Sequence, residues 1–276
     1  MRTSTYMFRN TTRAESGARM LDAQDRAGAL FVQSVEKAMA ILSAFHHADG
    51  PLTLSELADR ANVERSAAQR MVHTLRAMGY IRRDADQKGF LPGIRILDHT
   101  LDYLRLHPLV RAATPVLQEL RRSVRERVDL SLFDDTRVLY AVRLQTKRQT
   151  FNTSLVGHSV PTFCSSGGLA ILSKMLDGQA RDIVERSDRQ PFTPDTLTDV
   201  EAVLEKVNQT RAMGFSLTTN QILLGEIAAG FPVLDNKGSP VAAIHIAGSL
   251  AEWTENEYIQ KVVPLGLQAA RAISQY

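Results

Sequence analysis

The chain of 276 residues is predicted to be an α+β protein in which a mainly helical N-terminal domain precedes a larger domain built around a sheet. Three observations predict this. Apolar residues recur at helical spacing through residues 34–78, and they alternate with polar residues at strand spacing in 128–144. Between these regions, residues 94–104 are again helical in period and stop before Pro108, as expected for a helix that joins two domains.

The N-terminal domain begins with a helix that is predicted to be capped by Ser34. The apolar stripe expected to face inward consists of Val35, Ala38, Met39, Leu42 and Phe45. A second helix is predicted after Thr53, because Thr53 and Glu56 have the spacing of a capping box. Asn62 follows this helix, and asparagine tolerates the left-handed backbone that a tight turn between two helices needs.

The third predicted helix begins at Arg65 and has two chemically different faces. Its outer face is polar and consists of Arg65, Ser66, Gln69, Arg70, His73 and Arg76. The opposite face is apolar and consists of Ala67, Ala68, Met71, Leu75 and Met78. Arginine and glutamine can each form paired hydrogen bonds with base edges in the major groove, so this division favours the recognition helix of a helix-turn-helix. An ordinary amphipathic helix with a solvated polar face is the alternative interpretation.

Residues 79–92 contain two short apolar runs on either side of a charged turn, which is the signature of a β-hairpin. The domain is therefore predicted to be a winged helix-turn-helix, with Arg82, Arg83 and Lys88 near the phosphates of bound DNA. The residues predicted to contact double-stranded DNA are Arg65, Ser66, Gln69, Arg70, His73, Arg82 and Lys88.

Charge alone does not predict strong DNA binding. Residues 29–92 contain eight Lys or Arg and seven Asp or Glu, so affinity has to come from positioned charges and from pairing of two copies. Residues 1–28, with five arginines and three acidic residues, are predicted to be a mobile arm. The expected domains are this arm, the winged domain at 29–92, a linker helix at 93–107 and a second domain at 108–276.

The second domain shows both helical and strand patterns. A helix is predicted at 109–127 and a strand pair at 128–132 and 138–144. Further strands are expected at 149–156, 215–219, 226–234 and 241–247, and further helices at 167–176 and 195–213. A capping box formed by Thr254 and Glu257 opens the last helix. These elements predict an antiparallel sheet with helices on one side and a single sensing-size pocket.

Several classes of protein are disfavoured by what the sequence lacks. It contains no phosphate-binding loop, no dinucleotide-binding glycine motif, no cysteine pair and no HExxH motif, so we expect no cofactor, no metal and no enzymatic activity. No apolar run reaches membrane-spanning length and no secretory signal opens the chain, which predicts a cytoplasmic protein without membrane contact. The single Cys164 cannot form an internal disulfide, in keeping with a reducing compartment.

A glycine- and serine-rich segment at 157–168 leads directly into a predicted apolar helix. Small residues at a helix start leave backbone N–H groups open, and together with the helix dipole these favour a carboxylate or another small anion. A helix start that is capped and tightly packed for structural reasons is the alternative interpretation.

Several segments together resemble the IclR family of bacterial transcriptional regulators, and the resemblance covers nearly everything after residue 30. The segments are 33–35, 40–42, 66–75, 79–81, 157–172, 214–215 and 231–233, with Asp235 and Gly238. The resemblance implies a winged helix-turn-helix followed by a GAF-like effector domain. It also implies a homodimer or a dimer of dimers, and a small metabolite as ligand, often an organic or aromatic acid.

The family's sensing site, carried over by the resemblance, implies a pocket lined by Gln149, Phe151, Asn152, Ser165, Ser166, Gly167, Thr218, Thr219, Asn220, Ala228, His245 and Ala247. Thr218 to Gln221 stand where many relatives carry acidic residues, and Ala228 stands where some carry a polar or thiol residue. These departures leave the ligand open. His245 interrupts an apolar strand and could donate to a carboxylate, and a structural histidine is the competing interpretation.

The sequence therefore predicts a dimeric regulator whose binding to a palindromic operator is controlled by a small organic acid. Two alternatives stay open. Cys164, with His158 and His245, could form a cysteine hydrolase site, although the segment lacks a local nucleophile signature. Alternatively, the second domain could serve dimerisation only, with no ligand.

Overall fold

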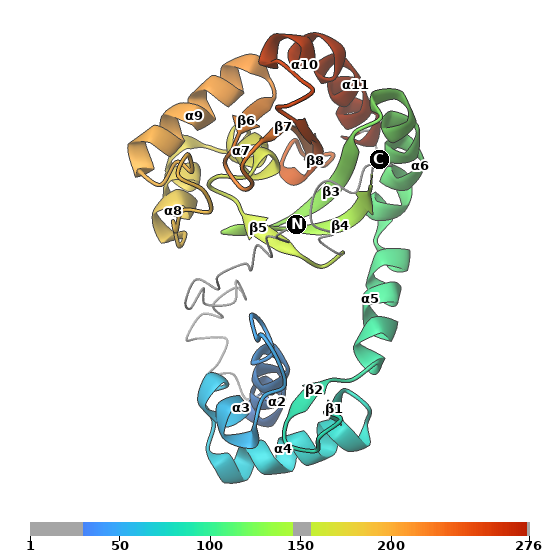
Figure 1. Ribbon diagram of the computed structural model, residues 1–276, viewed down its shortest axis with the longest axis vertical. Coiled ribbons are helices and arrows are strands. Elements are labelled where there is room, and N and C mark those ends of the chain that lie inside the picture. The colour runs from blue at the N-terminus through green and yellow to red at the C-terminus, as the bar shows by residue number, and fades with distance from the viewer. Residues whose placement is uncertain (1–29, 146–155, 275–276) are drawn as a thin grey trace, which may run out of the picture. The chain divides into compact units, whose positions relative to one another are not determined.

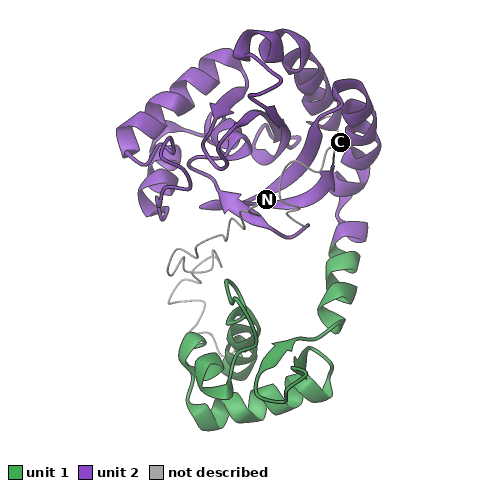
Figure 2. Cartoon of the chain, in the orientation of Figure 1, with its two compact units in different colours: residues 1–103 green, residues 104–276 purple. Residues whose placement is uncertain are grey.

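The computed structural model describes residues 30–145 and 156–274 (Figure 1). The chain divides into two compact units, residues 1–103 and 104–276 (Figure 2). In the described part of the chain, no helix is both long enough and apolar enough to cross a membrane.

The first unit confirms the predicted winged helix-turn-helix. Its elements are α2 (Gln33–Ser43), α3 (Leu54–Arg60), α4 (Arg65–Ala77), β1 (Ile81–Arg83) and β2 (Phe90–Pro92). Strands β1 and β2 pair antiparallel and form the wing. The core between the helices and the wing contains Ile41, Leu57, Ala68, Val72, Leu75, Ile81 and Phe90.

Two local predictions for this unit are confirmed in detail. Thr53 Oγ1 accepts a hydrogen bond from Glu56 N–H at 3.3 Å, and Glu56 Oε2 accepts one from Thr53 N–H at 2.7 Å, which completes the capping box. Asn62 has a φ of 52°, so it takes the left-handed backbone in the turn before α4. Both features are specified by residues that lie within one helical turn of each other in the sequence.

Three predictions for this unit are wrong. Helix α2 begins at Gln33 and has no side-chain cap, so Ser34 does not serve as one. Val35 and Met39 are 58% and 57% exposed, because only the second half of α2 reaches the core. Met78 is 53% exposed, since α4 ends at Ala77 and this side chain lies beyond its packed face.

Helix α5 (Arg95–Leu106) and helix α6 (Pro108–Val124) follow the wing, with Pro108 in the first turn of α6. The second unit then contains a six-stranded antiparallel sheet in the order β5-β4-β3-β8-β7-β6. Its strands are β3 (Arg127–Asp134), β4 (Arg137–Leu144), β5 (Ser159–Pro161), β6 (Ser216–Thr219), β7 (Glu226–Leu234) and β8 (Pro240–Ser249).

Helices pack on both faces of this sheet, which corrects the prediction of helices on one side only (Figure 1). On β8, Ile244 and Ile246 point into the core shared with α6 and α11, whereas Ala243 packs with Ile171 of α7. The remaining helices are α7 (Ser166–Leu172), α8 (Asp177–Arg186), α9 (Val200–Met213), α10 (Glu255–Lys261) and α11 (Val263–Ser274). Both faces of the central strands are therefore buried.

Most predicted elements of the second unit are present, with shifted ends. Helix α9 begins at Val200, five residues later than expected, because the side chain of Asp199 accepts from Ala202 N–H and caps it. Strand β5 and helix α8 were not predicted, since three residues are too few to show a period and α8 buries only Ala180, Ile183 and Val184. The strand expected at 149–156 lies almost entirely outside the described residues, and Val156 is in a turn.

Candidate functional site

The outer face of α4 presents a continuous set of polar side chains. Ala68, Val72 and Leu75 are buried on the inner face, where α4 packs against α2 and α3. Every residue that the sequence predicted for the DNA-reading face of this helix is exposed, namely Arg65, Ser66, Gln69, Arg70 and His73. A helix held by its apolar side and exposed on its polar side has the arrangement of a recognition helix.

The wing is held in shape by its own side chains. The Asp84 carboxylate accepts a hydrogen bond from Gly89 N–H at 3.0 Å across the turn. The Arg83 guanidinium lies 4.1 Å from the centre of the Phe90 ring and donates to the carbonyl of Gln87 at 3.0 Å. Arg83 is thus occupied within the wing, whereas Arg82 and Lys88 are exposed.

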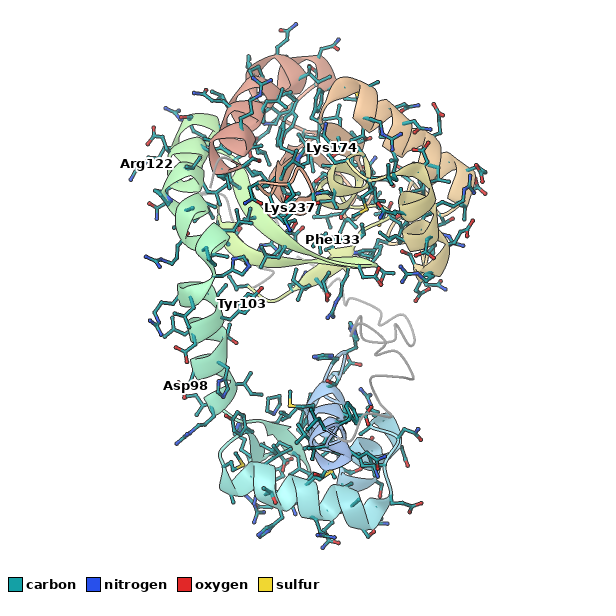
Figure 3. The ribbon with its side chains drawn as sticks, turned by 180° about the vertical axis from the view of Figure 1, so that it is seen from behind. Asp98, Tyr103, Arg122, Phe133, Lys174 and Lys237 are labelled. Carbon is teal, nitrogen blue, oxygen red and sulfur yellow. The ribbon has the colours of Figure 1, made fainter. Side chains whose placement is uncertain are left out.

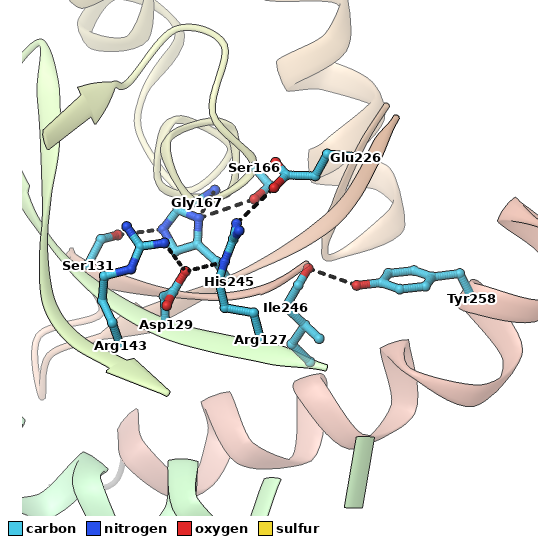
Figure 4. Close-up of polar contacts among 10 residues, drawn as sticks. All are labelled: Arg127, Asp129, Ser131, Arg143, Ser166, Gly167, Glu226, His245, Ile246 and Tyr258. Atoms are coloured by element: carbon cyan, nitrogen blue, oxygen red, sulfur yellow. Dashed lines mark hydrogen bonds and ion pairs between the residues drawn. The ribbon is translucent and has the colours of Figure 1, made fainter. Parts of the chain in front are cut away.

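In the second unit, charged and polar side chains gather on the face of the sheet that α7 covers. We call Arg127, Asp129, Ser131, Arg143, Glu226 and His245 the buried polar cluster (Figure 4). The register of the sheet brings its members together, because Asp129 pairs with Arg143 on β4 and with His245 on β8. The side chain of Asp129 is fully buried and that of Arg143 is only 5% exposed.

Ion pairs connect the charged members of the buried polar cluster. Asp129 Oδ2 accepts from Arg127 Nε at 3.0 Å and from Arg143 Nη2 at 3.1 Å. Arg127 Nη2 also donates to Glu226 Oε2 at 2.9 Å. Burial raises the pKa of the Asp129 carboxyl, although the positive charges of Arg127 and Arg143 act in the opposite direction.

His245 joins the sheet to the start of α7. Gly167 N–H donates to His245 Nδ1 at 3.3 Å, so this nitrogen carries no proton, and Nε2–H therefore donates to Ser131 Oγ at 2.7 Å. Ser166 Oγ also lies 3.2 Å from Nδ1. Burial, together with the positive charges of Arg127 and Arg143, lowers the pKa of His245 to about 3, and the ring is neutral at physiological pH.

The start of α7 can approach the sheet only because glycines lie at the contact. A methyl group at Gly230 of β7 would overlap the backbone carbonyl of Ser166, and one at Gly167 would overlap the ring of His245. Gly168 N–H donates to Ser165 Oγ at 3.2 Å. The prediction that backbone N–H groups here stay open is therefore wrong for Gly167 and Gly168, because side chains of the protein itself occupy them.

The other predicted pocket residues fall into three groups. One cross-strand row of the sheet contains Thr218 on β6, Ala228 on β7 and Ala247 on β8, and it ends at Arg127 on β3. The row of His245 lies next to it. Thr218 and Thr219 also line a small cavity of about 160 Å³. Asn220 holds a loop instead, since its side chain donates to Asp195 and accepts from Gly225 N–H. Gln149, Phe151 and Asn152 lie outside the described residues.

The charged members of the buried polar cluster were not predicted from the sequence. The signal was present, because Asp129 and Ser131 alternate with Val128 and Leu130 along β3. In a sheet with one solvated face such polar residues would point to water and carry no information. Here α7 covers that face, and the same residues become buried polar groups that need partners.

The arrangement disfavours a cysteine hydrolase. Cys164 is 1% exposed and lies in an apolar cluster with Phe163, Leu169 and Leu172. Burial raises the pKa of its thiol, which disfavours the thiolate that acts as a nucleophile.

Comparison with known proteins agrees with this architecture. The family model for the bacterial transcriptional regulator IclR C-terminal domain matches residues 101–275, and the model for the IclR helix-turn-helix domain matches residues 34–85. The Pca regulon regulatory protein of Pseudomonas putida is 28% identical over 242 residues, which cover 87% of this chain and 82% of that protein.

Solved structures show the same fold. The IclR protein of Thermotoga maritima matches with a TM-score of 0.67 and 23% identity, covering 88% of this chain and 98% of that one. An IclR homologue of Microbacterium hydrocarbonoxydans, crystallised with 4-hydroxybenzoate, matches with a TM-score of 0.71 and 23% identity over the same shares of the two chains. Because the IclR C-terminal model alone matches more than half of the sequence, this chain belongs to the IclR family of bacterial transcriptional regulators.

Proposed function

We propose that this transcriptional regulator binds a palindromic operator in double-stranded DNA as a homodimer or a dimer of dimers, and that a small organic acid bound in the second unit controls this binding. The observation that carries the DNA half of the proposal is the exposed polar face of α4, backed by a wing with Arg82 and Lys88 exposed. The residues that we propose to contact DNA are Arg65, Ser66, Gln69, Arg70, His73, Arg82 and Lys88. As a DNA-binding regulator, the protein is proposed to act in the cytoplasm.

The proposed roles within the DNA interface differ. Gln69 and Arg70 project from the middle of the exposed face of α4, where side chains of a recognition helix meet base edges. Arg82 and Lys88 lie on the wing, where a positive charge meets phosphates of any sequence. Unit 1 is nearly neutral overall, so two copies of this interface are needed for tight binding.

The acid half of the proposal is supported by the two arginines of the buried polar cluster: Arg127 ends the row of Ala228 and Ala247, and Arg143 lies in the neighbouring row of His245. The related Microbacterium protein was crystallised with 4-hydroxybenzoate, and that compound is an aromatic acid. For this chain we propose a ligand of the same broad class, contacted by the predicted pocket residues around the start of α7 and strands β6 to β8.

An electrophoretic mobility shift with DNA from upstream of the protein's own gene tests the proposal. The expected result is a retarded complex. The protein concentration that retards half of the DNA should change when one acid from a panel of aliphatic and aromatic carboxylates is added. Gln69→Ala should weaken this complex, whereas Gln179→Ala, at an exposed position on α8 of the second unit, should leave it unchanged. If no acid changes this protein concentration, the second unit serves dimerisation alone and the acid half of the proposal fails.

A further inference from the structure

The Arg143 guanidinium has more hydrogen-bond donors than partners. Its Nη2 donates to Asp129 Oδ2, but Nε and Nη1 have no partner among the described residues. The side chain is 5% exposed, and both of these nitrogens are shielded from bulk solvent. Nearly all buried donors in proteins are paired, and a buried guanidinium with two unpaired nitrogens is therefore exceptional.

Asp129 has the complementary feature. Its Oδ2 accepts from both Arg127 and Arg143, while Oδ1 is buried and has no partner among the described residues. An unpaired donor and an unpaired acceptor thus lie on two side chains that touch each other (Figure 4). A molecule bound here would need an acceptor for Arg143 and a donor for Asp129.

The neighbouring groups do not supply these partners. Ser131 Oγ and His245 Nε2 bond to each other, and His245 Nδ1 is occupied by the start of α7. Arg127 uses Nε for Asp129 and Nη2 for Glu226. The guanidinium carbon of Arg143 lies over the Tyr140 ring, 4.0 Å from the ring centre, and this contact together with the ion pair to Asp129 restrains the guanidinium. The unpaired atoms are consequently held in a defined orientation.

Resting on the proposed function, we infer that Arg143 and Asp129 determine which acid the regulator senses. Arg143 Nε or Nη1 donates to the carboxylate of the effector, and Asp129 Oδ1 accepts a hydrogen bond from a donor group on the same molecule. Because the two side chains are in contact, the donor has to lie on the carbon next to the carboxylate or an equally short distance away. The effector is thus a small acid with an adjacent hydroxyl or ammonium group, such as a 2-hydroxy acid, a 2-amino acid or an ortho-hydroxy aromatic acid.

Matched pairs of acids test this inference on the full-length protein. Titration calorimetry would compare lactate with propionate, mandelate with phenylacetate, salicylate with benzoate, and alanine with propionate. At least one donor-bearing acid is expected to bind about tenfold more tightly than its partner, the effect of one buried hydrogen bond. The hydroxyl and ammonium pairs distinguish the two kinds of donor. Equal affinity within every pair that binds would overturn the role of Asp129.

Substitutions at Arg143 test whether this side chain binds the carboxylate of the acid. Arg143→Gln removes the charge, and Arg143→Lys keeps a positive charge beside Asp129 while losing the planar set of donors. Both variants are expected to bind the acid at least about tenfold more weakly. The matched control is Arg122→Gln, because Arg122 is 72% exposed on the outer side of α6 (Figure 3). This variant should bind the acid as tightly as the unsubstituted protein.

The outcomes separate this inference from the proposed function. Operator binding without acid serves as the folding check for each variant. If an acid shifts operator binding and a folded Arg143 variant binds that acid with unchanged affinity, the inference is overturned and the proposed function stands. If no acid binds the unsubstituted protein, the acid half of the proposed function fails, and the inference fails with it. Should neither variant fold, the matched pairs on the unsubstituted protein decide the outcome.

Discussion

The outer face of α4 and the buried polar cluster both consist of charged and polar side chains, but they stand in opposite environments. Gln69 and Arg70 are exposed, while Asp129 is fully buried and Arg143 nearly so. A polar residue at a solvated helix position adds little to the free energy of unfolding, so it can contribute to binding without being needed for folding. In the cluster the charges of Asp129 and Arg143 have been removed from water, and binding and folding depend on the same atoms.

This difference has a practical consequence for mutagenesis. Substitutions on α4 should separate DNA binding from the free energy of unfolding. Substitutions in the buried polar cluster should change the free energy of unfolding first, and any effect on ligand binding has to be measured against that background.

Asp129→Ala is expected to lower the free energy of unfolding of the second unit by about 3–5 kcal/mol, because it leaves two buried arginines without their shared partner. Denaturant unfolding followed by circular dichroism would measure the change. The control on the same strand is Asp134→Ala, whose partly exposed pair with Arg137 should contribute no more than about 1 kcal/mol. Equal losses in the two variants would mean that burial of the cluster does not govern its energetics.

Lowering the pH from 7 to 4.5 should destabilise the second unit by about 2–3 kcal/mol through His245 alone. The folded pKa of about 3 lies below the ordinary value of 6.5, so the unfolded chain binds more protons between these two pH values. The contribution of neutral His245 to the free energy of unfolding is therefore fully present above about pH 6.5 and is lost progressively as the pH falls towards 3. In His245→Gln this component of the pH dependence should disappear, and an unchanged slope would show that the ring already titrates normally in the folded protein.

Arg70→Ala and Gln69→Ala should each weaken binding to the specific operator by about 1–3 kcal/mol. The free energy of unfolding should change by less than about 0.5 kcal/mol, since both side chains are exposed. Fluorescence anisotropy with operator and with scrambled DNA measures the first quantity, and thermal unfolding measures the second. Operator affinity equal to that of the unsubstituted protein in both variants would remove α4 from the DNA interface.

The smallest effect is expected for Lys88→Ala in the wing. Loss of one phosphate contact should weaken operator and scrambled DNA about equally and should reduce the slope of log affinity against log salt by about one per protomer. Measurement of affinity between low and moderate salt gives this slope. Asp86→Ala, also exposed on the wing, is the control and should not reduce the slope.

Features that depend on nearby residues could be predicted from the sequence. The capping boxes at Thr53 and Thr254 and the left-handed Asn62 formed as predicted, because their partners lie within one helical turn. The two faces of α4 also formed as predicted, except at Met78. The hairpin of the wing and the long strands β7 and β8 were also predicted from local period and turn residues. The start of helix α7 after Ser165 was also predicted in this way, from the run of small residues that precedes the apolar helix.

Which segment covers each face of a helix or strand could not be predicted from the sequence, because it depends on tertiary packing. Periodicity shows that Asp129 and Ser131 share one side of β3, but it does not show that α7 buries that side. His245 meets Ser131 and Gly167 from positions 114 and 78 residues away, contacts that no local pattern contains. The same limitation explains α2, whose stripe is exposed at Val35 because the small core ends before it. A sequence period fixes the direction of a side chain, whereas its environment depends on which distant segment packs there.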